Sequence, residues 1–149
     1  MKSALIALLA FCLCLPLMGD DTAKKNFERT KALAEQGNAS FQTHLGWMYQ
    51  FGKGVQKDDK EALKWYRKAA EQGFIRAQYS LAACYFHGQG VLKDNMTAYA
   101  WINIAEANGH AIAKKNKGVV AKKMTPDQIA KAQELSKEMI NKNPKLLNK

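Results

Sequence analysis

Apolar residues recur with helical spacing in two stretches of the chain that lie 36 residues apart. In the first stretch, Leu45, Met48 and Tyr49 fall at positions i, i+3 and i+4, which share one face of a helix. A second apolar run with the same spacing follows each stretch after a break, first with Ala62, Trp65, Tyr66 and Ala69, then with Ala98, Trp101, Ile102 and Ala105. The pattern predicts pairs of helices and an all-α fold.

The second pair repeats the first position by position. Residues 38–73 placed over residues 74–109 give twelve identities without a gap, whereas chance gives about two or three. The identities include both tryptophans of the second helices, Trp65 and Trp101. Gly37, Gly73 and Gly109 therefore mark the ends of three units, the first of which is truncated.

Glycine pairs separate the two helices of each unit, at Gly52 and Gly54 and again at Gly88 and Gly90. Glycine adopts left-handed backbone conformations at little cost, so these pairs predict tight loops. We expect each following helix to be capped by one of two polar residues: Asp58 or Asp59, and then Asp94 or Asn95. One such hairpin cannot bury its apolar face alone, so the units are expected to stack into a short α-solenoid.

Two segments carry a family resemblance, AQYSLAACYFHGQGVLKD at residues 77–94 and ALKWYRKAAEQG at residues 62–73. There the chain resembles the Sel1-like repeat family, which is related to the tetratricopeptide-type α-solenoids. The resemblance covers about residues 23–142. It implies a short right-handed α-solenoid of helix-turn-helix repeats with capping helices at both ends. The chain departs from the family pattern at Ala82, where a glycine is usual, and at Lys114 and Lys117, where apolar residues are expected.

The first 19 residues have the organisation of a secretory signal peptide. Lys2 precedes an apolar run that ends at Leu15, and Gly19 supplies a small residue at the expected cleavage point. The run is short for a membrane span, so we expect a cleaved, periplasmic or secreted protein of a bacterium. Two alternatives stay open, namely an uncleaved N-terminal anchor and lipidation at Cys12 or Cys14.

Residues 20–142 are expected to form the repeat domain, with a partial repeat at 21–37, full repeats at about 38–73 and 74–109, capping helices in 110–142 and a tail at 143–149. The N-terminal helix should span 21–36 with Phe27 and Leu33 facing inward. Thr125, Pro126 and Gln128 predict a capped helix that runs to Lys142. Its apolar stripe consists of Ile129, Ala132, Leu135, Met139 and Ile140. We expect the tail to fray.

The positive charge is concentrated near the C-terminus. Of the net charge of +10, residues 110–149 contribute +7 and residues 20–109 contribute +2. No aromatic residue follows Ile102, so the lysines lack the stacking surfaces that nucleic-acid binders use, and we expect no nucleic acid. An acidic protein partner, an anionic membrane surface contacted by the Lys-rich end, and a merely solvated face remain open.

No pattern of residues predicts catalysis. His44, His87 and His110 lack metal-ligand spacing, and the Gly88–Gly90 loop follows a helix rather than a strand, unlike a nucleotide-binding loop. We therefore expect no enzyme, cofactor or metal. Beyond the predicted signal peptide Cys84 is the one cysteine, which excludes an internal disulfide. Cys84 is either a buried core thiol or an exposed, reactive one.

Positions at which the two units differ are the candidates for binding residues, because packing of the repeat does not determine which residue stands there. In stacked hairpins the first helix of each pair lines the concave face. The candidate partner-binding residues on these helices are Thr43, Trp47, Gln50, Tyr79, Ala83 and His87. Trp47 belongs to a residue type enriched in binding hot spots, although packing against the N-terminal helix is an equal alternative.

The resulting hypothesis is an exported interaction module that binds a protein through its concave surface. The resemblance associates such proteins with envelope assembly, host contact and immunity to toxic effectors. The alternative is an enzyme or binder that acts on a cell-wall or β-lactam-type ligand.

Overall fold

A computed structural model describes residues 18–148 of the chain, so residues 1–17 of the predicted signal segment lie outside the described residues. The described part forms seven α-helices and one short 3-10 helix, and it contains no strand. The elements are α2 (Met18–Glu35), α3 (Ala39–Phe51), α4 (Asp59–Glu71), α5 (Ile75–His87), α6 (Asn95–Ala107), α7 (Ala111–Ala121), α8 (Pro126–Lys142) and η1 (Pro144–Leu146). The predicted all-α solenoid is confirmed.

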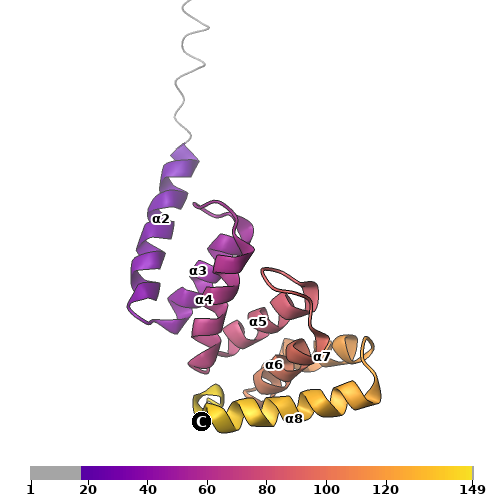
Figure 1. The fold of residues 1–149 in the computed structure, drawn as a ribbon. Coiled ribbons are helices and arrows are strands. Elements are labelled where there is room, and N and C mark those ends of the chain that lie inside the picture. Colours follow the sequence, from indigo (N-terminus) through magenta and orange to yellow (C-terminus); the bar gives the residue numbers. More distant parts are fainter. Residues whose placement is uncertain (1–17, 149) are drawn as a thin grey trace, which may run out of the picture.

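Helices α2 to α7 follow one another along the array, and α8 runs back below them (Figure 1). Each helix from α3 to α7 contacts the helix before it, whereas α8 lies against α6. Helices α3, α5 and α7 begin 36 residues apart, at Ala39, Ile75 and Ala111. The repeat length of the sequence is therefore the repeat length of the array, and α7 takes the position of the first helix of a third unit. The predicted N-terminal helix starts earlier than residue 21, at Met18.

Asp58 and Asp94 are the residues that cap the second helices of the two units. The Asp58 carboxylate accepts hydrogen bonds from the backbone N–H groups of residues 60 and 61, at 2.9 and 3.0 Å. Asp94 caps α6 in the same way. Because these bonds satisfy N–H groups that have no partner within the helix, they fix where each second helix begins.

Gly54 and Gly90, the second glycine of each loop, set how closely successive units approach. Both have a positive φ, of 72° and 70°. A Cβ atom at Gly54 would lie 2.2 Å from the carbonyl oxygen of Ala23, and one at Gly90 would lie 2.1 Å from that of Asp59. Each loop therefore rests on the backbone of the preceding unit, at a distance that leaves no room for a side chain.

The core consists of two apolar clusters along the row. The larger one joins α4 to α8 and contains the fully buried alanines Ala69, Ala77 and Ala98. The smaller one joins α2 to the first unit through Phe27, Ala34, Leu45, Met48 and Trp65. Small side chains at the crossing points let the helix backbones approach closely.

The N-terminal helix differs in one detail from its prediction. Phe27 is buried as expected, but Leu33 is only half-buried. The fully buried positions of α2 are Phe27, Thr30 and Ala34, whose spacing places them on one face. Leu33 lies at the edge of that face.

Helix α8 spans the predicted residues, and its predicted start is confirmed. Thr125 and Gln128 form a capping box in which each side chain bonds to the other residue's backbone N–H. Ala132 and Ser136 are buried, while the remaining stripe residues Ile129, Leu135, Met139 and Ile140 are half-buried. The helix covers the flank of α6, as expected of a capping helix.

The expected fraying of the tail was wrong, because residues 143–148 dock on the repeats. We call this segment the C-terminal strap. The Leu146 side chain is 2% exposed, and its carbonyl oxygen accepts hydrogen bonds from Gln78 Nε2 at 2.8 Å and Asn108 Nδ2 at 2.7 Å. The Asn143 amide donates to the Glu71 carbonyl oxygen at 2.8 Å. The sequence pattern missed these contacts because they join residues far apart in the chain.

Gly73 and Gly109 provide a matched test of the strap. Both have a positive φ, of 85° and 89°, but a Cβ atom at Gly73 would lie 2.3 Å from the Lys145 carbonyl oxygen, whereas one at Gly109 would meet nothing within 4 Å. Both alanine substitutions should cost about 1–2 kcal/mol of backbone strain. We expect Gly73→Ala to cost about 1–3 kcal/mol more, because it also displaces the strap.

Urea unfolding of the two variants measures that difference. In a chain shortened to end at Lys142, Gly73→Ala and Gly109→Ala should destabilise equally. Two results would contradict docking of the strap at Gly73. One is equal destabilisation by the two substitutions in the full chain, and the other is a larger effect of Gly73→Ala that persists in the shortened chain.

Candidate functional site

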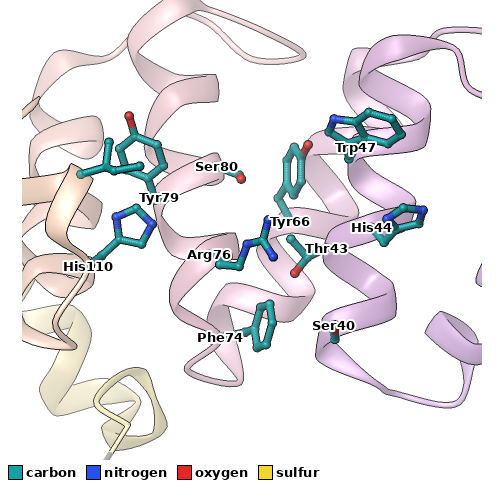
Figure 2. Close-up of a pocket in the computed structure, with 11 residues that line it drawn as sticks. Ser40, Thr43, His44, Trp47, Tyr66, Phe74, Arg76, Tyr79, Ser80 and His110 are labelled. Atoms are coloured by element: carbon teal, nitrogen blue, oxygen red, sulfur yellow. The ribbon is translucent and has the colours of Figure 1, made fainter.

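One face of the array carries two neighbouring hollows between its first helices. The first, which we call the α3–α5 hollow, has a volume of about 430 Å³. Its lining residues come mainly from α3, α5 and α7: Ser40, Thr43, His44, Trp47, Tyr66, Phe74, Arg76, Tyr79, Ser80, His110 and Ile112. Figure 2 shows the aromatic residues Trp47 and Tyr79 on opposite sides of this hollow.

The second hollow lies between α5 and α7 and has a volume of about 220 Å³. We call it the α5–α7 hollow. It is lined by Tyr79, Ala82, Ala83, Phe86, His87, Ile102, Asn116, Val119 and Val120. Tyr79 lines both hollows and forms the ridge between them. We refer to the two adjacent hollows together as the groove.

The structure brings five of the six predicted binding residues into this groove. Thr43 and Trp47 line the α3–α5 hollow, Ala83 and His87 line the α5–α7 hollow, and Tyr79 lines both. These residues were selected because they differ between the units. Their positions show that the first helices face the groove, as the repeat arrangement predicts.

Gln50 is the candidate that lies outside both hollows. Its Oε1 accepts a hydrogen bond from the Tyr66 hydroxyl at 2.7 Å, and its Nε2 donates to Gln89 Oε1 at 2.9 Å. Gln50 therefore holds α3 to α4 and to the loop of the second unit. The equivalent residue of the next unit, Phe86, lines the α5–α7 hollow instead.

Trp47 is exposed and lines the α3–α5 hollow, and it does not belong to the apolar cluster that joins α2 to the first unit. Its side chain is 41% exposed and stacks on His44 with ring centroids 5.6 Å apart. Phe51, one turn further on, lies 5.5 Å away and is 56% exposed. The N-terminal helix instead places Phe27 against Tyr49, at 5.4 Å. An exposed aromatic stripe of this kind is costly in water and typical of contact surfaces.

Arg76 and His110 line the α3–α5 hollow, and the search of unlike positions missed both. Arg76 is equivalent to Ser40 and, after a further 36 residues, to Ile112, and all three residues line the hollow. Both residues differ from their equivalents in the other units. A comparison of equivalent positions that included the first turn of each helix and the third unit would have identified them.

His110 and Tyr79 form a fixed wall of the hollow. Their rings stack with centroids 4.6 Å apart, and the Tyr79 hydroxyl accepts a hydrogen bond from Asn116 Nδ2 at 2.6 Å. His110 Nδ1 accepts the backbone N–H of Ala113 at 3.1 Å and so caps α7. The groove is therefore rigid at this wall.

Cys84 is a core thiol rather than a reactive one. It is 1% exposed, and burial, assisted by the charge of Asp59, raises the pKa of its thiol to about 12. The thiolate is the nucleophilic form of cysteine, so this side chain is unreactive at neutral pH.

No group of three or more His, Cys, Asp or Glu side chains within residues 18–148 is arranged to hold a metal ion. Among the helices described, none has the length and apolar character needed to cross a membrane.

The cap at His110 predicts a pH dependence of stability. Burial and the nearby positive charge of Arg76 lower the pKa of His110 from its ordinary value of 6.5. As the pH falls below that value, the unfolded chain takes up a proton before the folded chain does, so the free energy of unfolding decreases. Asparagine also caps helices but does not titrate.

We therefore expect His110→Asn to lose less stability than the wild type between about pH 7 and about pH 5. Urea unfolding at both pH values measures the two losses. Equal losses in the two proteins would show that protonation of His110 does not couple to folding.

Comparison with known proteins places this architecture. The family model described as Sel1 repeat matches residues 39–74 and 75–110. No curated protein matches the chain. Among solved structures, a protective antigen of uropathogenic Escherichia coli strains, described as displaying an SLR fold, is 36% identical with a TM-score of 0.78. That match covers 83% of this chain but only 27% of the antigen.

A Sel1 repeat protein from Oxalobacter formigenes is 43% identical with a TM-score of 0.58, and the match covers 60% of this chain and 67% of that protein. The Sel1 repeat fold is that of a protein–protein interaction module. The chain belongs to the Sel1 repeat family.

Proposed function

We propose that this chain is an exported adaptor that binds a segment of another protein in the groove formed by α3, α5 and α7. The observation that carries the proposal is the position of Trp47, which is exposed beside a hollow of about 430 Å³ instead of packing in the core. Export rests on the signal-like first 19 residues.

The groove has the properties of a contact surface for a protein segment. Its helices are packed into the array, so the groove needs little ordering when a partner binds, and less free energy is lost on association. It combines exposed rings with hydroxyl and imidazole groups, as protein interfaces combine aromatic anchors with polar contacts. A segment lying along the groove would pass both hollows, with Tyr79 between them.

The partner is proposed to be acidic. Residues 110–149 carry a net charge of +7, and among the described residues 110–148 the lysines in ion pairs are Lys117, Lys131 and Lys137. The remaining lysines would attract an acidic protein and speed its association. An immunity protein, an envelope-assembly protein and a host-contact protein would each bind an acidic partner through the groove and these lysines.

Trp47→Ala tests the proposal. We expect it to weaken partner binding at least about thirtyfold, the effect of losing a hot spot worth about 2 kcal/mol. The free energy of unfolding should fall by only about 1 kcal/mol or less, because the side chain is already exposed. Leu92→Ala is the matched control, since Leu92 is 88% exposed and lies outside both hollows.

The partner is first captured from an envelope extract with the tagged protein, identified, purified and then titrated against each variant. Binding that is unchanged in Trp47→Ala, or lost equally in Leu92→Ala, would refute the groove as the binding surface. Failure of the wild type to retain any protein saturably would refute the proposed function.

A further inference from the structure

Arg76 lies inside the α3–α5 hollow without a charged partner. The hollow is lined by one guanidinium, two imidazoles and five hydroxyl groups, but by no carboxylate. In Figure 2 the Arg76 side chain extends from α5 toward Thr43 and Tyr66 across the hollow. Within residues 18–148, Arg76 forms no ion pair and no hydrogen bond through its side chain.

The second exposed arginine of the repeats behaves differently. The Arg67 guanidinium donates to the Tyr85 hydroxyl and so joins α4 to α5. Arg76 has no such structural contact, and its equivalents Ser40 and Ile112 show that the repeat does not require arginine at this position. Its charge acts within the hollow, where it contributes to lowering the pKa of His110.

Uncharged donors and apolar walls surround the guanidinium. The hydroxyls of Ser40 and Ser80 line the hollow, and neither forms a hydrogen bond with another described residue. Trp47 and Ile112 are 41% and 53% exposed and line the hollow with Arg76. The site therefore offers a single positive charge with free donors nearby, and apolar contacts beside it.

We infer that Arg76 receives the carboxylate of an acidic side chain in an extended segment of the partner, while apolar side chains next to that acid lie against Trp47 and Ile112. A guanidinium binds a carboxylate through two parallel N–H···O bonds. A single cation balances the single charge of a carboxylate, whereas a phosphate carries nearly two charges and is matched by clusters of arginines. This inference rests on the proposed function and names the chemistry recognised at the same groove.

Three short peptides test it: acetyl-Leu-Glu-Leu-amide, acetyl-Leu-Gln-Leu-amide and acetyl-Leu-Leu with a free C-terminal carboxylate. Each is titrated into the ¹⁵N-labelled protein, and the Arg76 Nε–H and the tryptophan indole N–H signals are followed by NMR, which detects weak binding. We expect the Glu peptide to bind about tenfold more tightly than the Gln peptide, because only the carboxylate forms charge-assisted hydrogen bonds with the guanidinium.

Arg76→Gln should remove the preference for the Glu peptide without unfolding the protein, since Arg76 is exposed. Arg29→Gln is the matched control, because it removes the charge of an exposed arginine on α2, outside the hollow, and it should keep the full preference. Thermal melts of both variants establish that they are folded.

The inference is overturned if the wild type binds the Glu and Gln peptides equally or binds neither. It is also overturned if Arg76→Gln retains the preference, or if the free-acid peptide binds more tightly than the Glu peptide, which would assign the site to a chain terminus. If the captured partner depends on Trp47 but not on Arg76, the proposed function stands and only the carboxylate site fails. If the partner is insensitive to Trp47→Ala, the proposed function itself fails.

Discussion

Successive units of the array approach each other so closely that their spacing determines which residues the loops and helix crossings can contain. At Gly54 and Gly90 the loop of one unit lies against the backbone of the unit before it, with no space for a side chain. Alanines such as Ala69 and Ala105 occupy the helix crossings and are completely buried. Small side chains at these points let each helix from α3 to α6 contact the helices on both sides of it, so that the array has a continuous core rather than a series of separate hairpins.

The groove is a consequence of that packing. The repeated residues are committed to loops, caps and the core, whereas the outward positions of α3, α5 and α7 are left free to vary. Variation along the row of equivalent positions Ser40, Arg76 and Ile112 changes a hydroxyl into a guanidinium and then into an apolar side chain. The same helical framework can thus carry different side chains in successive hollows, because these positions do not contribute to its core.

The fold could be predicted from the sequence because its determinants are local and appear twice. The identities at Gly52 and Gly88, and at Asp58 and Asp94, record loop geometry and capping that depend on neighbouring residues alone. The sequence left two candidates, Asp58 and Asp59, for the residue that caps α4, and only the folded chain identifies Asp58. Leu33 was misplaced because a residue at the edge of a helix face carries the same periodic signal as one at its centre.

The site was predictable only in part, for a different physical reason. Positions that differ between the units are positions that the shared packing does not fix, and this identified Trp47 on the edge of the α3–α5 hollow. It cannot distinguish a free side chain from one with an internal partner, as Gln50 has in Tyr66. The docking of Leu146 on Gln78 and Asn108 was likewise invisible, since a contact across 68 residues leaves no periodic trace.

The C-terminal strap also bears on how such a chain can grow. Besides α8, which precedes it, its described residues contact the last complete unit and the end of the unit before that, at Glu71, Gly73, Gln78 and Asn108. A whole 36-residue copy inserted ahead of residue 38 would leave every one of these contacts in place. The number of repeats is therefore independent of the strap that closes the array, so gene duplication can lengthen the groove by one unit at a time while the same C-terminal segment is kept.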